Sequence, residues 1–212
     1  MKPILFNTDM VRALLEGRKT VTRRVVKGYS LEHLEIDADG SIIGVYDQHE
    51  GCVRPVMDFA PYQPCDILYV RETWRVYEVG NPPPHCVIEY KAGGTEKFSK
   101  IIALPTTKGE WKPSIHMPKE AARLFLRVTY VRVERLQDIT SGQIDAEGCK
   151  EWAYSAKTGE ILPSGPSFFQ IKWDSTIKPA DLPLYGWAAN PWVWVIEFER
   201  VSKEAALKGS EG

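Results

Sequence analysis

The sequence has few of the residues that build metal sites or disulfide frameworks. Its 212 residues include four cysteines and four histidines. The cysteines have no Cys-x-x-Cys pair, and no histidine lies at ligand spacing from them. A structural zinc site and a disulfide scaffold are therefore not expected, and we predict no metal and no other cofactor. The cysteines are Cys52, Cys65, Cys86 and Cys149.

Long apolar runs and an excess of one charge are also missing. No segment approaches the roughly 20 apolar residues that a membrane-spanning helix needs, and no apolar run follows a charged start at the N-terminus. We therefore expect a cytoplasmic protein without a membrane partner. The formal net charge of -1 excludes tight binding of duplex nucleic acid through bulk electrostatics, but it is compatible with a local basic patch.

The apolar content is sufficient for a folded core. Hydrophobic residues make up 43% of the chain, enough for one full core with insertions or for two small domains. One domain over residues 1–201 fits better, because strand-like segments at both ends can then pair with each other. Loop-rich sequence indicates insertions at about 31–60, 92–112 and 153–166. The polar segment 202–212 is predicted to be a flexible tail.

Four segments, 66–77, 86–91, 124–136 and 192–200, have the alternation of β-strands. In 124–136 the alternation slips after Tyr130, which indicates a bulge or bend. Long, bent strands are what a small closed barrel requires.

The segment 66–77 places a carboxylate among apolar side chains. Tyr69 and Arg71 share one face of this strand, and Glu72 and Trp74 share the other. An unpaired buried charge is costly, so we predict that Glu72 either forms an internal salt bridge to an arginine or has a direct role in catalysis.

Two short helices are predicted from their end signals. Residues 8–16 carry an apolar stripe, with Thr8 as N-cap and Gly17 as a left-handed residue at the C-terminal end. Thr140 and Gln143 can form a capping box for a helix over 141–147. Glu147 then falls in the last turn, where the helix dipole disfavours a carboxylate. Either this glutamate has a role, or it is an ordinary exposed side chain.

A cluster of cations and hydroxyls follows the first helix. In an extended strand, Lys19 and Thr22 would point to opposite faces, whereas a turn brings positions three apart together. We therefore predict a turn, which is either a solvated basic helix end or a functional site. The cluster reads Gly17-Arg18-Lys19-Thr20-Val21-Thr22-Arg23-Arg24.

This cluster and three other motifs resemble the ASCH domain family over residues 4–200, in the long form found in phage and prophage genomes. The resemblance implies an α+β fold, a PUA-like mixed β-barrel with short helices packed around it. Where the family usually has Pro-Gly-Asp, this chain has Pro64-Cys65-Asp66, so a side chain occupies a turn position that favours glycine. The motifs are Gly-x-Lys-Thr-x-Thr-x-Arg at residues 17–24, the run 66–74, Glu147-Gly148, and the run 190–195.

The resemblance also implies an enzyme, because some small ASCH proteins are amidohydrolases that deacetylate N-acetylcytidine with a lysine, a threonine and a glutamate. These residues fall on Lys19, Thr22 and Glu147. A threonine hydroxyl is a weak nucleophile that needs a neighbouring base, and a lysine whose pKa is lowered can take its proton. Glu147 can then move protons to the leaving amine and activate water. Lys19 could instead be a cationic oxyanion stabiliser.

Two other functions remain open. The chain could be a PUA-like RNA-binding module or a ribonuclease, with basic residues on phosphates and aromatics stacked on bases. It could also be a phage accessory protein that binds another protein through its insertions. The predicted partner is thus a nucleoside or RNA, and protein partners stay undefined. The predicted substrate-binding residues are Thr20, Arg23, Arg24, Tyr69, Arg71, Glu72, Trp74 and Trp192.

Overall fold

The structure is a computed structural model, and it describes residues 1–27, 34–38, 42–47, 51–80, 85–98, 109–149, 153–154, 161–162 and 166–209. The fold is mixed α+β, as the sequence predicts. Within the described ranges, no helix has the length and apolar character needed to cross a membrane. Parts of the predicted insertions, including 39–41, 48–50, 99–108 and 155–160, lie outside the described residues.

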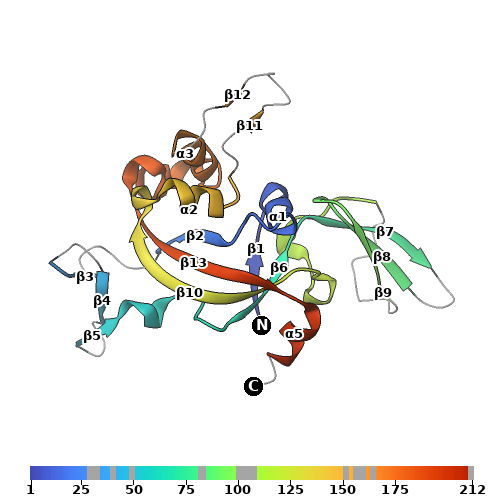
Figure 1. Ribbon diagram of the computed structural model, residues 1–212, viewed down its shortest axis with the longest axis horizontal. Coiled ribbons are helices and arrows are strands. Elements are labelled where there is room, and N and C mark those ends of the chain that lie inside the picture. Colours follow the sequence, from blue (N-terminus) through green and yellow to red (C-terminus); the bar gives the residue numbers. More distant parts are fainter. Residues whose placement is uncertain are drawn as a thin grey trace. The chain divides into compact units, whose positions relative to one another are not determined.

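One mixed sheet contains the strands that lead to the candidate site (Figure 1). Strand β1 pairs in parallel with β6, β10 pairs antiparallel with β6, and β13 pairs antiparallel with β2. The strand order is β1 (Lys2–Leu5), β6 (Ile67–Arg71), β10 (Phe125–Arg135), β13 (Trp192–Val201) and β2 (Val21–Val25).

The remaining strands form smaller antiparallel sheets. One contains β3 (Leu34–Ile36), β4 (Ile42–Asp47) and β5 (Cys52–Pro55). Another contains β7 (Trp74–Gly80), β8 (His85–Tyr90) and β9 (Thr95–Phe98). Strands β11 (Ala153–Tyr154) and β12 (Ile161–Leu162) pair with each other.

The helices are short. They are α1 (Thr8–Leu15), α2 (Ser141–Ala146), α3 (Pro166–Asp174), α4 (Leu182–Tyr185) and α5 (Lys203–Lys208). Helix α5 occupies residues that were predicted to be a flexible tail, so that prediction is wrong for 203–208. Ser202 caps this helix by accepting a hydrogen bond from the amide of Ala205, and Ala206 is completely buried.

The expectation that 66–77 and 86–91 share one sheet with 124–136 and 192–200 is confirmed for 67–71, which form β6 of that sheet, and is wrong for 74–77 and for 86–91. The chain leaves the main ladder after Arg71, and β7 pairs with β8 in a separate sheet. The side-chain alternation nevertheless continues through the break, because the backbone stays extended while its hydrogen bonds change partner. The Val70 amide bonds to the Leu124 carbonyl, whereas the Trp74 amide bonds to the Lys112 carbonyl.

The slip predicted in the long middle strand is present as a shift of burial. Val128 and Val131 are buried in β10, and the two residues between them, Thr129 and Tyr130, are both exposed. The strand therefore changes which face it buries at this point.

The chain folds into two compact units, each built from separate stretches of sequence. Unit 1 comprises residues 1–17, 65–127 and 199–212, and unit 2 comprises 18–64 and 128–198. The core of unit 1 gathers Trp74, Val76, Ile88, Tyr90 and Met117 with smaller side chains. The core of unit 2 gathers Val21, Leu136, Ile144, Phe169, Trp173 and Val195, among others.

Candidate active site

The candidate site lies in unit 2, where β2 begins beside the end of helix α2. Lys19 forms an isolated antiparallel bridge with Glu147, and the Thr20 amide donates to the Ala146 carbonyl at 2.8 Å. These backbone contacts hold the start of β2 against the helix end, although the two segments are far apart in the sequence.

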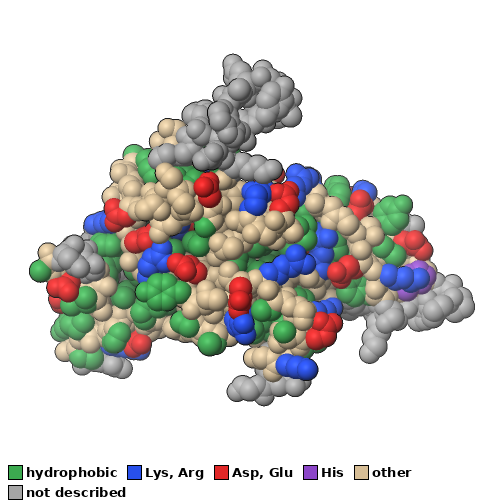
Figure 2. All heavy atoms as spheres, viewed as in Figure 1, with side chains coloured by type: hydrophobic (Ala, Val, Ile, Leu, Met, Phe, Trp, Pro, Cys, Tyr) green, Lys and Arg blue, Asp and Glu red, His purple; other side chains and the backbone are tan. Residues whose placement is uncertain are grey.

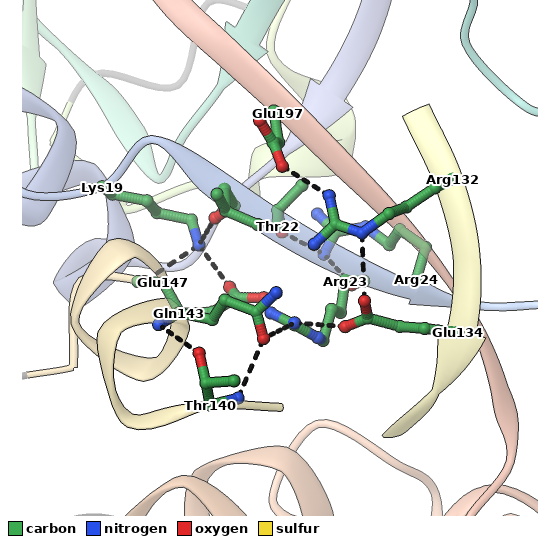
Figure 3. A network of polar contacts seen from close by, with 11 residues as sticks. Lys19, Thr22, Arg23, Arg24, Arg132, Glu134, Thr140, Gln143, Glu147 and Glu197 are labelled. Carbon is green, nitrogen blue, oxygen red and sulfur yellow. Dashed lines mark hydrogen bonds and ion pairs between the residues drawn. The ribbon is translucent and has the colours of Figure 1, made fainter. Parts of the chain in front are cut away.

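The turn predicted for Lys19 to Thr22 is not what the structure contains. Val21 to Val25 form strand β2, with Thr22 opposite Ile196 of β13. Because successive residues of a strand point to opposite faces, Lys19 and Arg23 can reach the same partner, and both bond to Glu147. Figure 3 shows these two side chains directed toward α2.

Lys19 is a completely buried ammonium with its donors satisfied. Its Nζ lies 2.7 Å from Glu147 Oε2, 2.9 Å from the Glu147 carbonyl oxygen and 2.7 Å from the Val21 carbonyl oxygen. Its side chain has 0% exposure. Burial lowers the pKa of Lys19, and the adjacent Glu147 carboxylate only partly opposes this effect. The site therefore holds a lysine that gives up its proton more readily than an exposed lysine does.

Glu147 is fixed by the helix that it terminates. The predicted capping box of α2 is present: Thr140 Oγ1 accepts from the Gln143 amide, and Gln143 Oε1 accepts from the Thr140 amide. Glu147 is the C-cap, and its amide donates to the Gln143 carbonyl. Its exposed fraction is 5%, so it is not an ordinary surface glutamate. The cations Lys19 and Arg23 offset its unfavourable position in the helix dipole.

Arg23 supplies the second cation to Glu147. Its NH1 atom lies 3.2 Å from Glu147 Oε1, while NH2 lies 2.5 Å from Glu134 Oε1 and 3.1 Å from Gln143 Oε1. The carboxylate of Glu147 is thus divided, with one oxygen on each cation. Arg23 Nε is buried, and it has no hydrogen-bond partner among the described residues.

Thr22 is completely buried, and its hydroxyl is bonded by an arginine. Arg24 NH1 donates to Thr22 Oγ1 at 3.0 Å and to the Arg23 carbonyl at 3.0 Å. Burial lowers the pKa of Arg24, against the effect of the Glu147 carboxylate. A cationic donor on a hydroxyl oxygen stabilises the negative charge that this oxygen would develop on losing its proton. This contact favours ionisation of the Thr22 hydroxyl, although the side chain is closed to solvent in this structure.

Tyr69, Arg71, Glu72 and Trp74 belong to unit 1. The predicted salt bridge of Glu72 to an arginine is confirmed: Arg123 Nε lies 2.8 Å from Oε1, and NH2 lies 2.9 Å from Oε2. Trp74 has 0% exposure, so neither face of its ring is open to a base, and its predicted stacking role is wrong. Tyr69 packs against the core of unit 1, and Arg71 Nε donates to the Met117 carbonyl.

In unit 2, Trp192 is 8% exposed. The guanidinium of Arg135 lies 4.2 Å from the centre of its ring. A stacked cation already covers that part of the ring, which leaves little surface for a base. Thr20, the remaining predicted binding residue, is exposed at the start of β2.

Three residues of the site, Arg132, Glu134 and Gln143, were not predicted as functional. Glu134 bonds to Arg23 and accepts a 3.0 Å bond from Arg132 Nε. A signal was present in the sequence, because Arg132 and Glu134 lie two apart and so share a face of a long strand that is otherwise largely apolar. Gln143 was recognised only for its capping role.

The described residues include no group of three or more His, Cys, Asp and Glu side chains placed to hold a metal ion. Comparisons with protein-family models, curated proteins and solved structures gave no match. The function must therefore be inferred from the geometry of the site and from the sequence motifs.

Proposed function

We propose that the protein is a metal-independent amidohydrolase that removes the acyl group from the exocyclic amine of N-acetylcytidine or a related nucleoside. One observation carries the proposal. Lys19 and Glu147, two of the three residues that the resemblance to ASCH proteins assigns to catalysis, are 128 positions apart in the sequence. They nevertheless form a buried ion pair of 2.7 Å. The mixed sheet is compatible with the PUA-like barrel of this family, which we propose as the finer description of the fold.

In the first step, Thr22 Oγ1 attacks the acyl carbonyl carbon. Before the attack, Lys19 passes a proton to Glu147, a transfer that burial favours because the neutral pair loses no hydration. The Lys19 amine then accepts the Thr22 hydroxyl proton through an intervening water, because Thr22 adjoins Arg23 on strand β2 and points to the opposite face from Lys19 and Arg23. When the carbon–nitrogen bond breaks, the protonated Glu147 donates to the exocyclic nitrogen, and the cytidine amine leaves.

In the second step, water hydrolyses the acyl-threonine ester. Glu147, again a carboxylate, takes a proton from the water as the oxygen attacks the ester carbonyl carbon. The proton on Lys19 returns to Thr22 Oγ1 when the carboxylic acid departs. Glu147 then returns its proton to the Lys19 amine, which restores the starting ion pair. One water is consumed, and one amine and one acid are released.

The contacts give less support to RNA binding at these residues. The ammonium of Lys19 faces three oxygen acceptors of the protein, and the terminal nitrogens of Arg23 bond to Glu134, Gln143 and Glu147. Donors used in this way are not free to contact phosphates. On the face drawn in Figure 2, acidic and basic side chains lie next to each other, in line with the net charge of -1.

The test is incubation of the protein with N-acetylcytidine and a panel of other acyl-cytidines, with the products identified by mass spectrometry. We expect release of cytidine with the matching acid, and we expect EDTA to leave turnover unchanged, since no step uses a metal. Glu147→Gln is the matched control and should release no cytidine, because it keeps the shape of the side chain but removes the carboxylate that transfers protons. Recovery of every acyl-cytidine unchanged would contradict the proposal.

A further inference from the structure

Arg23 occupies a variable position of the Gly-x-Lys-Thr-x-Thr-x-Arg motif, so the motif itself assigns it no task. Its side chain is nonetheless as buried as those of Lys19 and Thr22. It also contacts Glu147 on the oxygen that Lys19 leaves free. Burying a second full charge beside Lys19 is costly. A side chain held at such a cost needs an explanation beyond packing.

The guanidinium of Arg23 is held in place by the cap of helix α2. Gln143 has a single side-chain oxygen, and this atom accepts from the Thr140 amide at 2.8 Å and from Arg23 NH2 at 3.1 Å. The capping box therefore holds Gln143 Oε1 in place, and this oxygen in turn orients the guanidinium of Arg23. Since Glu147 ends this helix, both acceptors of Arg23 on α2 are set by one short element.

The other end of Arg23 is tied to the sheet. Glu134 on β10 accepts from Arg23 and from Arg132, and Arg132 in turn bonds to Glu197 on β13. Charges of alternating sign thus run from Glu197 through Arg132, Glu134 and Arg23 to Glu147 and Lys19. Figure 3 shows this series of contacts, which lies within unit 2.

The charged and titratable groups around Lys19 come from two elements. Glu147 and Cys149 lie at and just after the end of α2, and Arg23 and Arg24 lie on β2. The carboxylate of Glu147 contacts the ammonium directly, at 2.7 Å. A cation that shares Glu147 weakens the hold of this carboxylate on the Lys19 proton, because part of its charge is directed to the other partner.

We propose, on the basis of the proposed function, that Arg23 is a positioning residue held by Gln143 and Glu134. It shares the Glu147 carboxylate with Lys19, each cation bonding to one oxygen. The division keeps the Lys19 amine accessible as a base at lower pH. Arg23 touches neither the reacting carbonyl nor Thr22 in this scheme, and it acts only through Glu147.

The direct test is the titration of Lys19 Nζ by ¹⁵N NMR, with the signal assigned from its loss in Lys19→Arg. In Arg23→Met the full charge of Glu147 acts on Lys19, so the titration midpoint of the Lys19 amine should move to higher pH by about one unit. At a given pH below the midpoint, the fraction of free amine is then about tenfold smaller. Arg23→Lys, which retains the cation, should move it less. An unchanged titration in a folded Arg23→Met protein would overturn the proposal.

Glu134→Gln provides a second test with the opposite sign. It removes the anion that balances Arg23 and keeps the shape, so Lys19 should titrate at lower pH than in the wild type. This variant decides the question even if Arg23→Met does not fold, and a titration equal to that of the wild type would overturn the proposal. Arg135→Met is the matched control. Arg135 is a part-buried cation of the same unit that bonds to the Asn190 carbonyl and stacks on Trp192, and its removal should leave Lys19 unchanged.

The titration does not depend on turnover, so it separates this proposal from the proposed function. If the wild type hydrolyses no acyl-cytidine but the two variants shift Lys19 in opposite directions, the positioning role stands and the amidohydrolase fails. If the wild type is active, the acid limb of the pH profile of kcat should lie at higher pH in Arg23→Met than in the wild type. The variant should then recover its rate as the pH is raised. Loss of rate by the same factor at every pH would contradict the positioning role.

Discussion

At the scale of the residue, the site depends on how one buried ammonium is satisfied. Of the three acceptors around Lys19 Nζ, two are main-chain carbonyls, those of Val21 and Glu147. No residue pattern identifies such acceptors, because every residue has a carbonyl. The motif therefore predicts which lysine matters, but not that Glu147 would supply both a side-chain and a backbone oxygen.

Cys65 gives a prediction about stability. It stands where the ASCH proteins that the sequence resembles usually have glycine, and its φ of 72° lies in the left-handed region that favours glycine. Cys65→Gly should raise the free energy of unfolding by about 1 kcal/mol, measured in urea, because the side chain no longer strains the turn. Cys65→Ala retains a Cβ, so its free energy of unfolding should stay close to that of the wild type. A glycine variant no more stable than the alanine variant would contradict this reading.

Glu72 gives a prediction about pH. Burial raises the pKa of Glu72 above its ordinary 4.5, and the hydrogen bonds from Arg123 only partly oppose this. The folded state then holds the proton more tightly than the unfolded state, so the contribution of this group to stability falls as pH rises above about 4.5. The free energy of unfolding of the wild type minus that of Glu72→Gln should therefore decrease between pH 4.5 and 7. Urea titrations that show this difference increasing would contradict the assignment.

At the scale of the element, the sequence predicts best where signals are local. The capping box of α2 was predicted from Thr140 and Gln143 and is confirmed. For α1, the cap is Asn7 rather than the predicted Thr8, because two capping residues stand side by side and Asn7 accepts from the Met10 amide. The break between β6 and β7 was not predictable, since alternation reports which face is buried and not which strand is the partner.

The contribution of the capping box to stability can be measured directly. Thr140→Ala removes the acceptor for the Gln143 amide and should lower the free energy of unfolding by about 1 kcal/mol, the usual cost of a lost N-cap. Chemical denaturation gives the value. Ser141→Ala, at the exposed next position, is the matched control and should cost much less. Equal losses in both variants would show that the cap adds nothing.

At the scale of the whole molecule, two units share one chain that passes from unit 1 to unit 2 and back twice. The candidate site uses two stretches of unit 2, 18–64 and 128–198, and the pairing of β2 with β13 joins them. The alternation of apolar and polar residues does not indicate which distant strands pair. The resemblance implies the α+β class, and the alternation predicts the strands β6, β7, β8, β10 and β13. The other described strands, the assignment of Glu72 and Trp74 to the other unit, and the network through Arg132 required the structure.

The central claim is that Lys19 acts as a base in a buried pair with Glu147, and the most direct measurement is the rate of N-acetylcytidine hydrolysis by Lys19→Arg beside the wild type and Lys19→Ala. Arginine keeps the charge, but its guanidinium stays protonated and cannot accept the Thr22 proton. We therefore expect Lys19→Arg to lose at least about 100-fold in kcat and to be nearly as inactive as Lys19→Ala. Near wild-type activity in Lys19→Arg would contradict it.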